Sequence, residues 1–137
     1  DKFEYITNKS QESIDLGVEF STFLNKGDII GLNGEIGSGK TTFAKGILLG
    51  LGYDGDVLSP TFTLINEYQT QFRIIHADFY RDNNPERWKN IGFEEMIFNS
   101  DIVLIEWSNL IPSLLPRNIH ILMFEHIELN KRKIFLK

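Results

Sequence analysis

Gly34-Glu35-Ile36-Gly37-Ser38-Gly39-Lys40-Thr41 is the stretch that determines the expected fold. Its glycines let the backbone wrap tightly and take positive φ angles, which other residues rarely adopt. Successive N–H groups can then point inward at one anion. A lysine followed by a hydroxyl residue completes the spacing of a phosphate-binding loop, or P-loop, in which the lysine reaches phosphate oxygens and the hydroxyl ligates Mg²⁺. The stretch, called the glycine loop below, therefore predicts a nucleoside triphosphate site.

The segments on either side of the glycine loop fit this prediction. Ile29–Leu32 is a short apolar run typical of a strand, and Thr41–Leu51 reads as a helix that ends before Gly52. A helix that begins at the loop adds its free N–H groups and the positive end of its dipole to the phosphate site. This order of strand, loop and helix favours a nucleotide site over a turn that is merely rich in glycine.

The rest of the sequence predicts further strands and helices around this unit. A helix over Ser10–Leu24, with Ser10 as its N-cap, is expected to follow a short strand at Phe3–Thr7. The other expected elements are a hairpin of Thr61–Tyr68 and Phe72–Phe79, an interrupted helix over Pro85–Phe98, a buried strand at Ile102–Ile105, and strands at Ile119–Phe124 and Ile134–Leu136. We therefore expect residues 1–137 to form one α/β domain of the P-loop NTPase fold, with a mixed, mostly parallel β-sheet flanked by helices in three layers.

The composition argues against direct, tight binding of nucleic acid by this chain. The formal net charge is −5 and the pI is about 5.2, whereas a free-standing nucleic-acid binder usually has a basic surface. Lys131-Arg132-Lys133 is the densest basic stretch and reads as the solvated end of a hairpin. Cysteine is absent, which excludes disulfides and thiolate metal sites and fits a reducing cytosol.

No apolar run approaches the roughly 20 residues that span a bilayer. The N-terminus lacks the charged segment followed by an apolar one that is typical of a secretory signal. We therefore expect a cytoplasmic protein with no membrane association.

Hydrolysis of a bound triphosphate requires acidic groups near the metal in addition to the glycine loop. Glu106 follows the buried run Ile102–Ile105, and Asp78 follows the run Phe72–Ala77. Ligands of open α/β sheets bind at the carboxyl ends of the strands, so both carboxylates are placed to face the phosphate site. Each of them could instead be an exposed carboxylate at a strand end.

Three other features have two interpretations each. The hydroxyls of Ser59-Pro60-Thr61-Phe62-Thr63 could reach a γ-phosphate or metal as a switch-like segment, although a loop that enters a strand often has this composition. His76 is predicted to be a hydrogen-bonded strand histidine rather than a catalyst. Trp107 could belong to the core or to a surface that meets a partner.

The motifs GxxGxGKTT, SPTFTL, HADFYR and LIEW follow one another in this chain, and the similarity runs from about Ile14 to Trp107. This combination resembles the TsaE (YjeE) family of small bacterial ATPases; SPTFTL at Ser59–Leu64 and the final IEW make the resemblance specific. It implies a role in forming threonylcarbamoyladenosine beside the anticodon of ANN-decoding tRNAs. In that family the ATPase associates with the TsaD–TsaB pair, and its ATP cycle is needed for repeated turnover; tRNA is met only through that complex.

The glycine loop and the resemblance together predict the ligand contacts. We expect ATP or ADP to contact Ser10, Glu35, Ile36, Gly37, Ser38, Gly39, Lys40, Thr41 and Thr42. By resemblance, Thr41 and Glu106 are the Mg²⁺ ligands, and Asp78 acts in hydrolysis together with Lys40. Ser108 stands where the family commonly has proline, and the sequence after it diverges, so base contacts are not transferred to that stretch.

Three other functions share the glycine loop. A small GTPase would need an NKxD-type guanine reader and a DxxG switch, but Asn8-Lys9-Ser10-Gln11 precedes the loop and lacks the aspartate, and Asp78-Phe79-Tyr80-Arg81 lacks the glycine. A small-molecule kinase would need an arginine-bearing lid, for which Arg81, Arg87 and Arg117 are candidates, although the chain is short for such a lid. A nucleotide-gated binding module would not depend on hydrolysis. Because no dedicated water-orienting residue is evident, we expect slow turnover in isolation.

Overall fold

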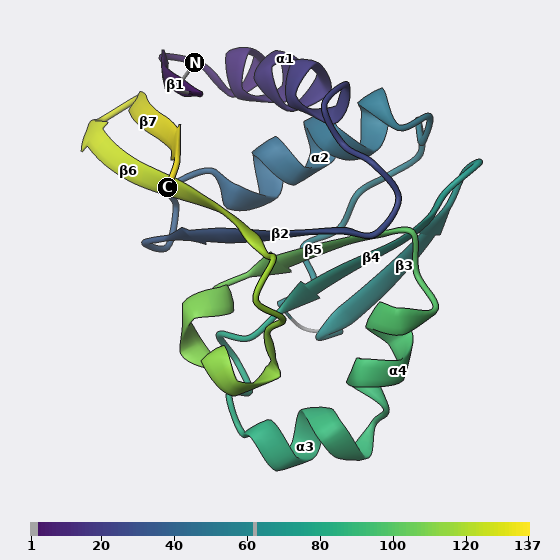
Figure 1. The fold of residues 1–137 in the computed structure, drawn as a ribbon. Helices are drawn as coiled ribbons and strands as arrows, with labels where there is room; N and C mark the ends of the chain where they lie inside the picture. Colours follow the sequence, from purple (N-terminus) through teal and green to yellow (C-terminus); the bar gives the residue numbers. More distant parts are fainter. Residues whose placement is uncertain (1–2, 62) are drawn as a thin grey trace.

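The computed structural model describes residues 3–61 and 63–137, which form three layers (Figure 1). Helices α1 and α2 lie on one side of a mixed sheet, and α3 and α4 lie on the other. The strands are β1 (Glu4–Thr7), β2 (Asp28–Gly34), β3 (Ile65–Gln69), β4 (Arg73–Asp78), β5 (Ile102–Glu106), β6 (His120–Glu128) and β7 (Lys131–Leu136). The helices are α1 (Ser10–Ser21), α2 (Lys40–Gly50), α3 (Pro85–Asn90) and α4 (Phe93–Phe98), with 3₁₀ turns η1 (Ser108–Leu110) and η2 (Pro112–Leu114). None of the described helices is both long and apolar enough to cross a membrane.

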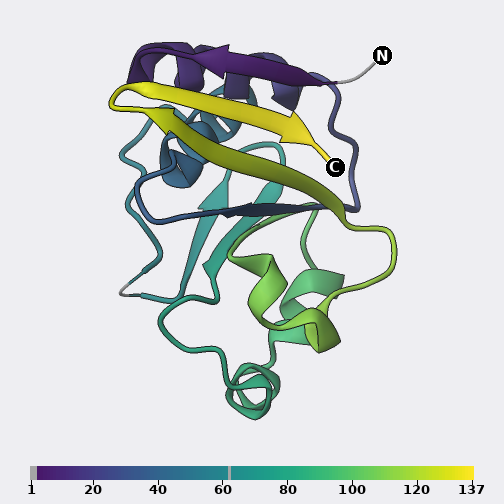
Figure 2. The same ribbon diagram turned by 90° about the vertical axis from the view of Figure 1, so that its left-hand side faces the viewer.

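The sheet has the order β1-β7-β6-β2-β5-β4-β3. Its four central strands, β6, β2, β5 and β4, are parallel, whereas β3, β7 and β1 pair antiparallel with their neighbours. Figure 2 shows β1, β7 and β6 side by side in front of α1 and α2. This arrangement confirms the expected α/β fold with a mixed sheet. Because β2, β5 and β4 are parallel and adjacent, their carboxyl ends meet at one edge, with Glu106 in register with both Leu32 and Asp78.

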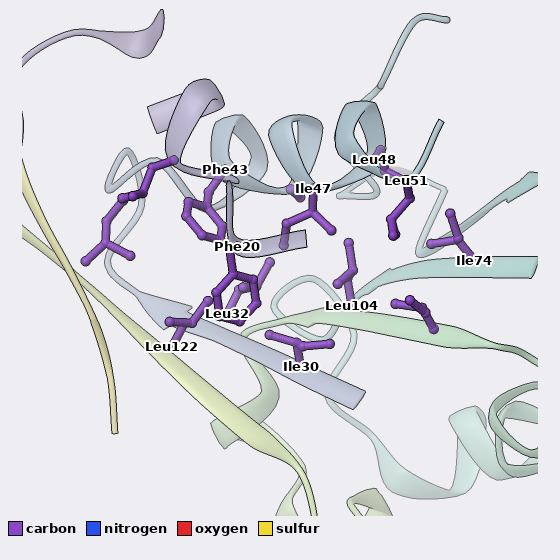
Figure 3. Packing of buried hydrophobic residues seen from close by; sticks show 14 of the residues in the cluster. Phe20, Ile30, Leu32, Phe43, Ile47, Leu48, Leu51, Ile74, Leu104 and Leu122 are labelled. Atoms are coloured by element: carbon purple, nitrogen blue, oxygen red, sulfur yellow. The ribbon is translucent and has the colours of Figure 1, made fainter. Parts of the chain in front are cut away.

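Both faces of the central strands are buried, which explains their continuous apolar sequence. On one face, Ile30, Leu32, Ile74 and Leu104 pack against α1 and α2 (Figure 3). On the other face, alternate residues of β4 and β5 pack against α3, α4 and the 3₁₀ turns. Full burial of one large aliphatic side chain contributes about 1.5–3 kcal/mol. The core thus fixes the strands whose ends carry the predicted site.

Helix α2 lies very close to α1 because glycines occupy the contact between them. A Cβ atom on Gly46 would overlap the backbone carbonyl of Ile14, and a Cβ atom on Gly17 would overlap that of Phe43. These obstacles are backbone atoms and cannot rotate aside. Since α2 starts at the glycine loop, this contact also helps to position the predicted site.

Gly46→Ala is therefore expected to lower the free energy of unfolding by about 1–3 kcal/mol, the usual effect of overpacking a core. The loss should be seen even though alanine is favoured over glycine in a helix by about 1 kcal/mol. Urea unfolding checks this, with the exposed Lys45→Ala as the control, expected to change stability by at most about 0.5 kcal/mol. Unchanged or increased stability of Gly46→Ala would contradict the close contact.

The boundaries of α1 differ from those expected. The N-cap is Lys9, with φ −142° and ψ 154°, and Ser10 is the first residue of the helix, so its assignment as N-cap was wrong. The helix ends at Ser21 rather than at Leu24. The hydroxyls of Ser21 and Thr22 donate to carbonyls of the last turn at 2.6 and 2.7 Å, and these bonds compete with continuation of the helix.

The first strand of the predicted hairpin is also shorter than expected. It begins at Ile65 rather than at Thr61, because Leu64 has φ 68° and its N–H donates to the carbonyl of Pro60 in a turn. The antiparallel hairpin of β3 and β4 itself is confirmed. Gly52 has φ 103° and follows Leu51, the C-cap of α2, as its predicted position after the helix end requires.

Candidate functional site

A cavity of about 440 Å³ lies at the carboxyl ends of β2, β5 and β4. Its walls are the glycine loop and the start of α2, both predicted carboxylates, the connection from β1 to α1, and the turn between β6 and β7. The predicted site residues that line it are Ser10, Ile36, Gly37, Gly39, Lys40, Thr41, Thr42, Asp78 and Glu106. The side chains of Glu35 and Ser38 are not part of its lining: Glu35 is exposed, and Ser38 is buried behind the loop.

The backbone of the glycine loop needs glycine at several positions. Gly37 and Gly39 have φ angles of 78° and 97°, in the left-handed region that favours glycine. A Cβ atom on Gly34 would overlap the carbonyl oxygen of Phe124 on the neighbouring strand. Gly39 is the N-cap of α2, so the free N–H groups of that helix begin at the cavity. Such a set of N–H groups and the helix dipole suit an anion such as phosphate.

Lys40 is held inside the loop. Its Nζ donates to the carbonyls of Gly34 and Glu35 at 2.6 and 2.8 Å and to the hydroxyl of Ser38 at 3.3 Å. Burial lowers the pKa of Lys40, and the nearby carboxylates oppose part of that shift. A phosphate oxygen that binds this ammonium group would replace one of its loop acceptors, because the group has only three N–H donors.

Glu106 and Thr41 are in direct contact. The Thr41 hydroxyl lies 2.9 Å from Oε2 and 3.1 Å from Oε1 of Glu106. Hydroxyl and carboxylate oxygens are ligands that Mg²⁺ accepts, and Mg²⁺ usually binds through one or two carboxylates together with substrate phosphates. Over residues 3–61 and 63–137, no group of three or more His, Cys, Asp or Glu residues is placed to hold a metal. Thr41 and Glu106 fit a Mg²⁺ ion whose remaining ligands would be phosphate oxygens and water.

Asp78 is buried beside this pair, with 2% of its surface exposed. Its Oδ1 accepts from the backbone N–H of Tyr80 at 2.8 Å, and its Oδ2 accepts from the hydroxyl of Thr61 at 3.0 Å. Thr61 also contacts Ser59 at 2.8 Å, and both hydroxyl residues line the cavity. Thr63 instead bonds to Asn66 at 2.7 Å, and Phe62 lies outside the described residues.

Burial raises the pKa of Asp78, and the charge of Glu106 raises it further against the hydrogen bonds from Tyr80 and Thr61. The folded protein therefore holds this proton more tightly than the unfolded chain does. Stability from this group is present below the unfolded pKa of about 3.9 and is lost as the pH rises through the folded pKa.

Asp78→Asn should consequently be more stable than the wild type at about pH 7, and the difference should shrink as the pH falls toward 4. Urea unfolding without nucleotide at several pH values measures this difference. Asp54→Asn, at an exposed position, is the control and should show no such gain. A variant that is less stable than the wild type at pH 7 would contradict the inference that burial of the ionised carboxylate lowers stability.

Trp107 follows Glu106 and turns back over the cavity. Its φ of 59° is unusual for a non-glycine residue, and its N–H donates to the carbonyl of Leu32 at 2.9 Å. The ring lies 4.5 Å from Nζ of Lys40 and 4.8 Å from the ring of Tyr80. The side chain is partly exposed and lines the site, so it belongs to the cavity wall.

Two residues have contacts that the sequence did not reveal. His76 was expected to be fully hydrogen-bonded, but only its Nε2 has a partner in the described part of the chain, Oε2 of Glu106 at 2.7 Å, whereas Nδ1 has none. Arg132, assigned from sequence to a solvated hairpin end, lines the cavity and donates from Nε to the carbonyl of Gly37 at 3.1 Å. For His76 the available signal was a polar residue within an apolar strand, two positions before Asp78. For Arg132 there was none, because its partner is 95 residues away.

This chain is similar to known proteins both in sequence and in structure. A family model described as "Threonylcarbamoyl adenosine biosynthesis protein TsaE" matches residues 7–134. A tRNA threonylcarbamoyladenosine biosynthesis protein TsaE from Rickettsia felis is 38% identical over 129 residues, covering 93% of this chain and 75% of that protein. The protein of the same name from Bacillus subtilis is 39% identical over 98 residues, which are 71% and 61% of the two chains.

The crystal structure of Bacillus subtilis YdiB matches this fold with a TM-score of 0.84 and 28% sequence identity, covering 99% of this chain and 84% of that one. The family model spans nearly all of the sequence, and the match to the YdiB structure covers all three layers of this fold. The chain belongs to the TsaE family of threonylcarbamoyladenosine biosynthesis proteins.

Proposed function

We propose that this chain binds ATP and Mg²⁺ in the cavity, hydrolyses ATP slowly, and thereby supports tRNA threonylcarbamoyladenosine formation together with TsaD and TsaB. The observation that carries the proposal is the direct contact of Thr41 with Glu106, at 2.9 and 3.1 Å, at the point where the glycine loop enters α2. In the proposal this pair holds the metal, and the nearby lysine and N–H groups, which suit phosphate, support that role.

Each part of the cavity has a task in this proposal. The glycine loop and Lys40 bind the phosphates, with Thr42 as a further contact, and Thr41 and Glu106 hold the metal. A bound Mg²⁺ would neutralise phosphate charge. In the proposal Asp78 orients a water molecule or accepts its proton, and its raised pKa would make the carboxylate a stronger base once it is ionised.

The hydrogen bonds of Asp78 connect its carboxylate to the Ser59–Thr61 segment. Both of its oxygens already accept bonds, from Tyr80 and from Thr61. Each carboxylate oxygen can accept two hydrogen bonds, so Asp78 could orient a water beside these contacts, and the orientation of the carboxylate would depend on Thr61. A partner that moves the Ser59–Thr61 segment would therefore change the rate.

The kinase alternative finds no support in the position of the arginines. The cavity lining, as far as the chain is described, does not include Arg81, Arg87 or Arg117. Arg87 instead pairs with Asp82 at 2.9 Å beside a second groove. The arginine that does line the cavity, Arg132, is bonded to the glycine loop rather than carried on a lid.

The partners in this proposal follow from the family and the charge of the chain. Its net charge of −5 disfavours direct tRNA binding, so we propose that the chain contacts tRNA only indirectly, through TsaD and TsaB. The proposal includes a cytoplasmic location, which the cysteine-free composition fits.

The test is ATP hydrolysis by the chain alone and with purified TsaD, TsaB and unmodified tRNA. We expect a slow rate alone and a rate that changes several-fold when the partners are present. Lys45→Ala should behave as the wild type does, because this residue is exposed on α2 away from the cavity lining. A rate that is indifferent to the partners, with no stable association, would overturn the proposal and reopen the kinase alternative.

A further inference from the structure

Beneath the carboxylate of Glu106 lies a histidine that the proposed function leaves without a task. His76 is in β4, and its side chain is completely buried. Its Nε2 lies 2.7 Å from Oε2 of Glu106. The alternation of side chains along β4 places His76 on the same face of the sheet as Ile74 and Asp78. It therefore lies between the apolar core and the candidate site.

The burial of this histidine is unfavourable by itself. Its Nδ1 has no partner among the described residues, and an unsatisfied buried polar atom costs about 1–3 kcal/mol. An apolar side chain at this position would avoid that cost and continue the core formed by Ile74 and Leu104. The contact with Glu106 is what the histidine adds in exchange.

The direction of the hydrogen bond follows from the partners. A carboxylate that ligates Mg²⁺ is ionised and can only accept, so in the metal-bound state Nε2 would carry the proton and donate to Glu106. Asp78 is in register with Glu106, and His76 is in register with Leu104, so the imidazole approaches the carboxylate from the side of the core. Thr41 approaches it from the start of α2. The carboxylate of Glu106 is thus held by donors from two different elements.

We infer that His76 is a positioning residue, whose Nε2–H fixes the orientation in which Glu106 ligates Mg²⁺ together with Thr41. The inference rests on the proposed function, because it requires a nucleotide-bound metal at Glu106. Hydrogen bonds that orient a metal ligand typically change metal affinity by about 10–100-fold. His76 does not itself line the cavity and reaches it only through Glu106, so its effect should be confined to metal-dependent binding.

The test compares three proteins: the wild type, His76→Leu and His76→Gln. Leucine fills a similar volume without a donor, whereas the Nε2 of glutamine can occupy a place close to that of the histidine Nε2 and donate to Glu106. The dissociation constant of a non-hydrolysable ATP analogue is measured by calorimetry with Mg²⁺ and with EDTA. The quantity of interest is the ratio of the two constants, and urea unfolding checks that each variant is folded.

We expect the wild type to bind much more tightly with Mg²⁺ than with EDTA. His76→Leu should reduce this ratio by about 10-fold or more, and His76→Gln should restore it to within about threefold of the wild type. A purely structural role would weaken binding equally with and without metal and leave the ratio unchanged; that result would overturn the inference. The inference would also be overturned if folded His76→Gln reduced the ratio as much as His76→Leu does.

The wild-type ratio separates this inference from the function on which it rests. If the wild type bound the analogue equally well with Mg²⁺ and with EDTA, the proposed metal site would be wrong, and the inference would fail with it. If the wild type showed the Mg²⁺ dependence and both variants retained it, the metal site would stand and only the role of His76 would be rejected.

Discussion

Lys40→Ala is expected to raise the dissociation constant for ATP by at least about 100-fold and to abolish hydrolysis. Charge-assisted hydrogen bonds contribute about 1.5–3 kcal/mol each. Two such bonds from the ammonium group to phosphate oxygens correspond to about 3 kcal/mol or more, and each 1.4 kcal/mol is a factor of about ten in affinity. Calorimetry with ATP and Mg²⁺ measures the change.

The same helix provides a matched control. Lys45 is exposed five residues further along α2, whereas Lys40 is 5% exposed and bonded to the glycine loop. Lys45→Ala removes the same charge without touching the cavity. A surface substitution typically changes the free energy by at most about 0.5 kcal/mol, so the affinity should stay within about twofold. Tight ATP binding by folded Lys40→Ala would show that the phosphates are held elsewhere.

Glu106→Ala is expected to produce the second large effect, a loss of metal-dependent binding. With Mg²⁺, affinity for ATP should fall by at least about tenfold, because the substitution removes one of the two proposed protein ligands. With EDTA the loss should be much smaller, because the glycine loop and Lys40 are left intact. Calorimetry under both conditions separates the two cases.

A second variant guards against a fold defect at this buried position. Glu106→Gln keeps the volume of the side chain and an oxygen that can accept from Thr41 or His76, and it should show the same metal-specific pattern. Glu94→Ala, an exposed change on α4, should have no effect. Equal losses with and without metal in both Glu106 variants would contradict its role as a ligand.

Local sequence patterns were sufficient to predict the parts of the fold that frame the cavity. The apolar run ending at Glu106, the glycine loop and the helix after it are each encoded within about ten neighbouring residues. The parallel pairing of adjacent strands then brings Glu106 and Asp78 to the edge where the loop begins. The two carboxylates and the loop are brought together in the structure as these patterns predict.

The contacts that the sequence did not reveal depend on long-range packing. His76 and Glu106 are 30 residues apart, and Arg132 and Gly37 are 95 residues apart. Which histidine nitrogen finds a partner, or which arginine of a basic stretch turns inward, depends on how two strands are placed side by side. No short-range pattern encodes that placement.

Errors at element ends had a more local cause. At the start of α1, Ser10 had the residue type of an N-cap, but the helix begins one residue earlier than that assignment requires. A shift of a single residue is enough to place a capping residue type inside the helix. Its position nevertheless brings Ser10 to the cavity wall, where it was expected to contact the nucleotide.

The most direct test of this account counts how many threonylcarbamoyladenosine modifications TsaD and TsaB make on unmodified tRNA when the threonylcarbamoyl donor is in excess. The reaction is run with the wild-type chain, with Lys40→Ala, or without either. The account predicts many modifications per TsaD with the wild type, and about one with Lys40→Ala or with no added chain. Equal numbers of modifications in all three reactions would contradict it, because ATP binding at the glycine loop would then have no part in the repeated cycle.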